Sequence, residues 1–223
     1  MEIKILASGS KGNCYYVSDG QTPLLIECGI PWGQIQRKLD FKTSELRACL
    51  ISHMHDDHCK AIKEVEKFGI PIFSPEYIKP GDNFTVPITN ATWRVYAFDA
   101  VHNVPCLGFL LASNSGEKLL YLTDSAYSKY RFEGLTHVLI GANYDADLLN
   151  ESIAEGTVDR GERHRLIHSH ASLQTVKEML TANNLSKVQG IWLLHLSSRN
   201  ADAARFKKEI QELTGKVVHL PDE

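Results

Sequence analysis

The sequence lacks any apolar run of the roughly 20 residues that a helix needs to cross a membrane. We expect no signal peptide in it, because the apolar stretch in Met1-Glu2-Ile3-Lys4-Ile5-Leu6 is too short and too charged for one. A membrane-spanning helix and a secretory leader are therefore not expected. We predict a cytoplasmic location.

Cysteine is scarce, and its pattern argues against a small domain stabilised by disulfide bonds and against a zinc finger. The five cysteines are odd in number and lack the paired spacing of zinc fingers, so we expect reduced thiols in a reducing compartment. For Cys59 we expect a small buried helix residue, and contact with the histidines beside it is the alternative. The cysteines are Cys14, Cys28, Cys49, Cys59 and Cys106.

A strong charge of either sign is also missing, since the formal net charge is -3. This excludes a generally basic protein that coats nucleic acid, although a local basic patch can still attract a polyanion. The chain has 223 residues, of which 43% are hydrophobic, enough to bury one sizeable core. We therefore expect a single domain over residues 1–223.

The most informative stretch that is present is His53-Met54-His55-Asp56-Asp57-His58, directly after the apolar run Cys49-Leu50-Ile51. Side chains alternate along a strand, so His53 and His55 share one face, and a turn after them brings Asp57 and His58 in behind. Imidazole and carboxylate are good ligands for zinc, manganese or iron. The stretch predicts a metal site at a strand end, and a solvated loop is the alternative.

Three further histidine or aspartate residues follow apolar strand-like runs. His102 comes after residues 93–98, Asp124 after 118–123 and His195 after 190–194. Taken singly, they have ordinary alternatives: a turn histidine, a turn or helix-cap aspartate, and a core histidine. Taken together with His-x-His-x-Asp-His, in this order, they resemble the ligand pattern of the metallo-β-lactamase superfamily.

The resemblance implies a binuclear site holding two divalent metal ions, zinc or manganese, with iron as a further option. His53, His55 and His102 would hold one metal, Asp57, His58 and His195 the other, and Asp124 would bridge them. A metal-bridging hydroxide would be the nucleophile, with Asp57 as the catalytic residue that orients it. Glu27 would accept a hydrogen bond from the second ring nitrogen of a histidine ligand and so orient it. The superfamily usually has aspartate at this place, and an ordinary charged strand end is the alternative.

The resemblance also bears on the substrate. Asp124 stands where many antibiotic-hydrolysing members have cysteine, which favours phosphodiesters or thioesters. Residues 8–13, Ser-Gly-Ser-Lys-Gly-Asn, resemble a loop of WalJ (YycJ) type exonucleases, and a hairpin turn is the alternative. Residues 168–173 resemble another segment of that family, in which His170 would contact a phosphate or act as the second catalytic residue by protonating the leaving oxygen. The expected substrate-binding residues are Ser8, Ser10, Lys11, Asn13, His168 and His170.

The resemblance thus implies a nuclease whose partner is nucleic acid, with DNA as the expected substrate. Rival functions are a phosphodiesterase for cyclic nucleotides or other small diesters, a glyoxalase II-like thioesterase, and a non-catalytic binding module stabilised by metal. Nucleic acid would have to be bound by basic residues and tyrosines near the motif loops. For the basic residues the alternative role is surface solubility, and for the tyrosines it is packing in the core or at its rim. These residues are Lys11, Lys129, Arg131, Arg160, Arg163, Arg165, Arg199, Tyr15, Tyr127, Tyr130 and Tyr144.

Apolar runs between turn residues predict a mixed α and β chain. Strands are expected at 3–7, 14–18, 23–27, 70–73, 93–98, 106–112, 118–122, 136–140, 190–194 and 216–220. Helices are expected at 32–39, 59–68, 173–182 and 201–213. The polar stretch 143–168 is read as a helix and loop segment near the site. The predicted fold class is α+β, the four-layer αββα sandwich of metallo-β-lactamase type.

Overall fold

The computed structural model describes residues 1–86, 90 and 92–221. The chain forms two compact units, each built from two segments. Unit 1 comprises Met1–Asp99 and Leu107–Glu117, and unit 2 comprises Ala100–Cys106 and Lys118–Glu223, of which residues up to 221 are described. The units are described in turn, and the expected single-domain organisation stays a prediction.

Unit 1 is built on a five-stranded sheet in the order β1-β2-β3-β4-β5. The first three strands are antiparallel, whereas β3, β4 and β5 run parallel. Because β3 and β4 are parallel, both end at the same edge of the sheet, where the predicted metal cluster begins. The strands are β1 (Glu2–Ala7), β2 (Cys14–Ser18), β3 (Pro23–Ile26), β4 (Ala48–Leu50) and β5 (Ile72–Phe73).

Unit 1 also contains three antiparallel strands that pair in the order β6-β7-β8. Strands β7 and β8 lie close to the runs that the sequence predicted, but β6 was missed because Asn-Phe-Thr-Val carries little apolar signal. The strands are β6 (Asn83–Val86), β7 (Trp93–Asp99) and β8 (Leu107–Ser113).

One predicted helix of unit 1 is wrong in its extent. A single helix was expected at 59–68, but α2 ends at Cys59 and α3 begins at Ile62. The break lies at Ala61, whose backbone N–H donates to the carbonyl of Cys28 (2.9 Å) instead of continuing the helix. The helical segments of unit 1 are α1 (Trp32–Lys38), the short 3-10 helix η1 (Thr43–Glu45), α2 (Asp56–Cys59) and α3 (Ile62–Lys67).

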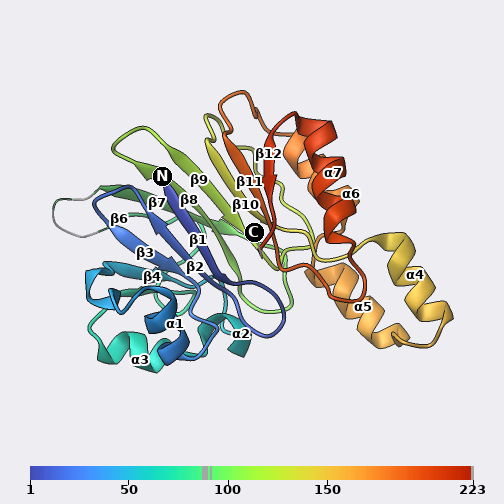
Figure 1. Cartoon of the computed structure of the whole chain (residues 1–223), viewed down its shortest axis with the longest axis horizontal. Helices are drawn as coiled ribbons and strands as arrows, with labels where there is room; N and C mark the ends of the chain where they lie inside the picture. Colours follow the sequence, from blue (N-terminus) through green and yellow to red (C-terminus); the bar gives the residue numbers. More distant parts are fainter. Residues whose placement is uncertain (87–89, 91, 222–223) are drawn as a thin grey trace. The chain divides into compact units, whose positions relative to one another are not determined.

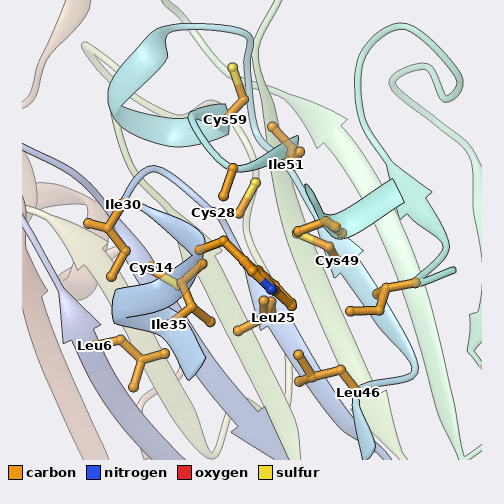
Figure 2. Close-up of a cluster of buried hydrophobic side chains, with 14 of the residues drawn as sticks. Leu6, Cys14, Leu25, Cys28, Ile30, Ile35, Leu46, Cys49, Ile51 and Cys59 are labelled. Atoms are coloured by element: carbon orange, nitrogen blue, oxygen red, sulfur yellow. The ribbon is translucent and has the colours of Figure 1, made fainter. Parts of the chain in front are cut away.

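Helices α1 and α3 pack on the sheet through one buried hydrophobic cluster. Ile35 of α1 and Val65 of α3 join Leu25 of β3 and other side chains with little or no exposed surface. Figure 2 shows this cluster and the four cysteines among its side chains, Cys14, Cys28, Cys49 and Cys59. All five cysteines of the chain are buried, as expected of structural thiols.

Burial makes these thiols poor nucleophiles. Burial and the neighbouring Cys28 and Asp56 raise the pKa of Cys59 to about 11, and burial raises the pKa of Cys14 well above its ordinary value. A raised pKa keeps a thiol protonated, and the thiolate is the reactive form. At about pH 8 we expect Cys59 in the folded protein to react with iodoacetamide on the order of 10²-fold more slowly than an ordinary thiol.

Mass spectrometry after timed exposure to the reagent measures this rate. The same protein in denaturing urea is the control, and all of its thiols should react quickly. Equal rates in the folded and the unfolded protein would contradict the burial of the cluster.

Unit 2 is built on four parallel strands in the order β12-β11-β10-β9. Strand β10 is buried along its whole length, as is typical of parallel strands covered on both faces. Helix α7 packs beside β12 and α6 (Figure 1). The elements are β9 (Lys118–Leu122), β10 (His137–Gly141), β11 (Gly190–Leu194), β12 (Val217–His219), α6 (Leu173–Thr181) and α7 (Ala203–Thr214).

The polar stretch 143–168 forms two helices, α4 (Ala146–Ala154) and α5 (Arg160–Ser169). Each begins at an aspartate that accepts two backbone N–H groups, Asp145 for α4 and Asp159 for α5. Those two hydrogen bonds hold the pKa of the Asp159 carboxyl below its usual range. The helix and loop interpretation of this stretch agrees with the structure. Among the described residues, no helix combines the length and the apolar character needed to span a bilayer.

Candidate functional site

The end of β4 gathers three histidines and an aspartate of unit 1. His53 and His58 are fully buried, His55 and Asp57 are half-buried, and the ring of His53 lies 4.6 Å from that of His55 and 4.1 Å from that of His58. Nε2 of His53 lies 3.0 Å from Nδ1 of His55, and Nε2 of His58 lies 3.5 Å from Oδ2 of Asp57. The sequence prediction that these four side chains converge agrees with this geometry.

Glu27 supports this cluster from the end of the neighbouring strand β3. Its carboxylate is fully buried, accepts the backbone N–H of Ser52 (3.1 Å) and lies 3.5 Å from Nδ1 of His58. Histidine ligands of metals are commonly oriented in this way by a carboxylate on the far ring nitrogen. The contact supports the orienting role expected of Glu27, which stays a prediction.

Asn13 joins the Gly-rich loop 8–13 to the same cluster. Its Nδ2 group lies 3.0 Å from Nε2 of His58 and donates to Oδ2 of Asp57 (3.4 Å), while its Oδ1 accepts the hydroxyl of Tyr15 (2.9 Å). Asn13 is fully buried, and besides the cluster and Tyr15 it contacts the backbone of Gly9 in its own loop. The substrate contact expected of Asn13 stays a prediction, as do those of Ser8, which is half-buried, and of Ser10 and Lys11, which are exposed.

In unit 2, three polar side chains follow the carboxyl ends of adjacent parallel strands. Asp124 follows β9, Asn143 follows β10 and His195 follows β11. Oδ1 of Asp124 accepts the hydroxyl of Thr123 (3.1 Å) and lies 3.6 Å from Nε2 of His195. Asn143 steadies His195, because its Nδ2 group lies 3.0 Å from Nδ1 and donates to the carbonyl of that residue (2.9 Å).

Of two more histidines in unit 2, His170 lies near Asp124 and His102 lies beside His170. Nε2 of His170 is 3.7 Å from Oδ1 of Asp124, and the ring of His170 is 5.5 Å from those of His102 and His195. Nδ1 of His102 donates to the carbonyl of Ser169 (2.9 Å). Because that nitrogen carries the proton, the lone pair of neutral His102 lies on Nε2, as a metal ligand requires.

His170 lies at the carboxyl end of α5, two residues before Ser172, which immediately precedes α6. Ser172 caps α6, since its side chain accepts the backbone N–H of Thr175. His168 is exposed on α5, where it stacks on His164 at 4.2 Å. Its substrate contact stays a prediction.

Left-handed backbone marks the strand ends that carry this chemistry. Glu27, Asp124 and His195 have φ angles of 63°, 46° and 52°. Residues other than glycine seldom adopt this conformation, and it concentrates at functional sites. In each case it turns the chain sharply after a strand.

The donor set of each unit fits a divalent metal. Unit 1 supplies three crowded imidazoles and a carboxylate, and unit 2 supplies a carboxylate with histidines beside it. Neutral imidazole and carboxylate are ligands of zinc, manganese and iron, so they do not distinguish these metals. His102 presents the correct nitrogen, and Glu27 and Asn143 hold the rings of His58 and His195.

Sequence reasoning missed Ser52, Thr123 and Asn143. Ser52 contacts Nδ1 of His53 (2.9 Å) besides donating its N–H to Glu27. Asn143 could have been found, because polar residues at the carboxyl ends of adjacent parallel strands meet at one edge of a sheet. Ser52 and Thr123 carry no such signal, since small hydroxyl residues are common at strand ends.

Comparison with known proteins bears on the fold first. Residues 7–79 match the family model of the metallo-beta-lactamase superfamily. The crystal structure of the metallo-beta-lactamase fold protein YhfI from Bacillus subtilis superposes on this chain with a TM-score of 0.74 at 15% identity, covering 98% of this chain and 95% of that one. This chain has the metallo-β-lactamase fold. The predicted α+β sandwich class is therefore confirmed.

Three other proteins are similar to this chain over most of its length. Human tRNase Z, short form, superposes with a TM-score of 0.60 at 14% identity, covering 99% of this chain and 96% of its own. Exodeoxyribonuclease WalJ of Streptococcus pneumoniae is 25% identical over 89% of this chain and 82% of its own length. Exodeoxyribonuclease YycJ of Bacillus anthracis is 28% identical over 64% of this chain and 60% of its own length. The resemblance to metallo-β-lactamase superfamily hydrolases and to WalJ (YycJ) type exonucleases is confirmed.

Proposed function

We propose that this chain is a metal-dependent phosphodiester hydrolase, and more specifically a nuclease that acts on DNA in the manner of an exonuclease. The observation that carries the proposal is the presence of all seven His and Asp residues that the resemblance assigns as ligands, in a chain similar to two exodeoxyribonucleases. The presence of every ligand favours an enzyme over a binding module, which would be expected to have lost some of them.

We assign the ligands as the resemblance implies. His53, His55 and His102 would hold one divalent metal ion, Asp57, His58 and His195 would hold the other, and Asp124 would serve both. When bound, such ions would supply an activated water and neutralise negative charge that develops on a phosphoryl oxygen. Zinc and manganese are both suitable.

The protein's own groups move the protons of the reaction. The Asp57 carboxylate accepts a proton from the water whose oxygen attacks phosphorus. As the bond from phosphorus to the leaving oxygen breaks, His170 donates a proton to that oxygen. The position of His170 supports this role, because its Nε2 lies 3.7 Å from Oδ1 of Asp124 and its Nδ1 lies 2.8 Å from Oγ of Ser169.

A panel of substrates tests the proposal directly. Protein loaded with zinc or with manganese is incubated with end-labelled single-stranded DNA, double-stranded DNA, RNA and cyclic mononucleotides, with Asp57→Ala as the blank. Stepwise shortening of a polynucleotide, absent from the blank, is the expected result. Cleavage of cyclic or small diesters alone would replace the nuclease by a small-molecule phosphodiesterase, to which the slightly acidic net charge of -3 is suited. No cleavage of any diester would refute the proposal.

His170→Ala is expected to lower turnover by about 10²-fold or more while metal content changes little, because a general acid acts on substrate. Steady-state rates and metal analysis by mass spectrometry measure the two quantities. His164→Ala, which removes an exposed histidine of the same helix α5, is the matched control and should keep both. Parallel loss of metal and activity in His170→Ala would make His170 a ligand or a structural residue.

A further inference from the structure

Tyr127 is the exposed member of the four tyrosines that the sequence places near the motif loops. Tyr15 and Tyr144 are buried and Tyr130 is half-buried, whereas 52% of the surface of Tyr127 is exposed. A large aromatic side chain in water is informative when its backbone is well fixed, because a rigid aromatic face can bind another flat group.

The backbone of Tyr127 is fixed next to two proposed metal ligands. Ser125 donates its hydroxyl to the carbonyl of Tyr127 (2.7 Å) and accepts the backbone N–H of Val101 (2.9 Å). The N–H of Ala126 donates to the carbonyl of Val101 (2.8 Å). These hydrogen bonds tie the segment to Val101, the residue that precedes His102. Tyr127 itself stands three positions after Asp124.

The far end of the same loop is anchored in unit 2. Phe132 is buried, its N–H donates to the side chain of Asn183 (2.6 Å), and with Tyr130 it lines a small apolar cavity. Loop 125–132 is thus fastened at both ends, and Tyr127 is exposed on the span between them.

Two cations follow Tyr127 within the same loop 125–132, one on either side of Tyr130 in the sequence. Lys129 and Arg131 are exposed, and Nζ of Lys129 lies 5.3 Å from the centre of the Tyr130 ring. An exposed aromatic side chain with cations in the same loop is a combination that binds single-stranded nucleic acid, since the ring stacks on a base and the cations contact the backbone phosphates. A duplex end with all bases paired offers Tyr127 no splayed base.

We propose that Tyr127, with Lys129 and Arg131, forms a binding site for an unpaired nucleobase beside the bond to be cleaved. The site would select a single-stranded DNA or RNA end over a blunt duplex and over a cyclic mononucleotide. This inference rests on the proposed nuclease function and adds the substrate class to it.

Binding of a fluorescent single strand of about ten nucleotides tests the site. The protein carries Asp57→Ala, so that the strand is not degraded, and anisotropy gives the Kd. We expect Tyr127→Ala to raise the Kd about tenfold, whereas Tyr127→Phe stays within about twofold because phenylalanine also stacks. Tyr77→Ala removes a tyrosine that is 64% exposed in unit 1, and it should leave the Kd unchanged.

The same substitutions in active protein separate this inference from the proposed function. Tyr127→Ala should raise the KM for single-stranded DNA and leave hydrolysis of a chromogenic diester without a nucleobase unchanged. Equal Kd values for Tyr127→Ala and its parent would overturn the stacking site and leave the nuclease proposal standing. If the protein hydrolyses the small diester but does not bind DNA, the stacking site is also overturned, whereas the proposal of phosphodiester hydrolysis stands. Loss of the small-diester activity in Tyr127→Ala would make Tyr127 structural and overturn the site as well.

Discussion

Replacing Asp57 by alanine is expected to reduce phosphodiester hydrolysis by at least about 10³-fold, because the carboxylate both binds metal and accepts the proton of the attacking water. The fold should survive. Asp57 is half-buried, and the hydrogen bond that its side chain accepts from Asn13 is long, at 3.4 Å. We therefore expect the free energy of unfolding of the metal-free protein to change by less than about 1 kcal/mol.

The neighbouring residue provides the control for this variant. Asp56 is exposed in the first turn of α2, and no metal is assigned to it. Asp56→Ala should therefore retain activity within about twofold, as is usual for surface substitutions away from special features. Turnover numbers and urea denaturation curves for both variants decide the matter. Wild-type activity in Asp57→Ala would remove this residue from the mechanism.

Gly29→Ala should be the most destabilising small substitution of the metal cluster. A Cβ atom on Gly29 would lie 1.7 Å from the carbonyl oxygen of Asp57 and 2.7 Å from the backbone nitrogen of His58. Both atoms belong to backbone, which cannot rotate away as a side chain does. Overpacking usually costs about 1–3 kcal/mol, and this clash should lower the free energy of unfolding by about 3 kcal/mol or more.

Gly33→Ala is the matched control, because Gly33 lies in helix α1 and its added methyl group would meet one side-chain atom, of Arg37, at 3.7 Å. Alanine favours a helix over glycine by about 0.8–1 kcal/mol, so this variant should be as stable as the wild type or more so. Urea denaturation gives both values. Equal midpoints for Gly29→Ala and wild type would mean that the loop of Asp57 and His58 shifts without resistance.

Strong apolar runs made much of the fold predictable. Strands β9 and β11 fall at 118–122 and 190–194 as expected, because each is a continuous apolar run. Tertiary contacts decided what the sequence could not, as at Ala61, whose hydrogen bond to Cys28 divides one predicted helix into two. Helices α4 and α5 have weak apolar patterns, and the capping aspartates Asp145 and Asp159 were the available signals.

The chemical residues of the site were predictable because histidine and aspartate ended apolar strands in a known order. The residues that hold them were not. Asn13 reaches His58 across 45 positions and Asn143 reaches His195 across 52, distances over which sequence spacing carries no information. The metal-ligand roles themselves stay predictions, as do the identity of the metals, the substrate contacts and the cytoplasmic location.

The left-handed residues at the strand ends bear on how such a chain evolves. Each non-glycine residue in this conformation costs roughly 1–3 kcal/mol, and glycine would relieve that cost. Glycine at Glu27, Asp124 or His195 would also delete the side chain. Selection for thermal stability alone would therefore favour glycine at these three positions. Continued selection for function is what preserves their side chains.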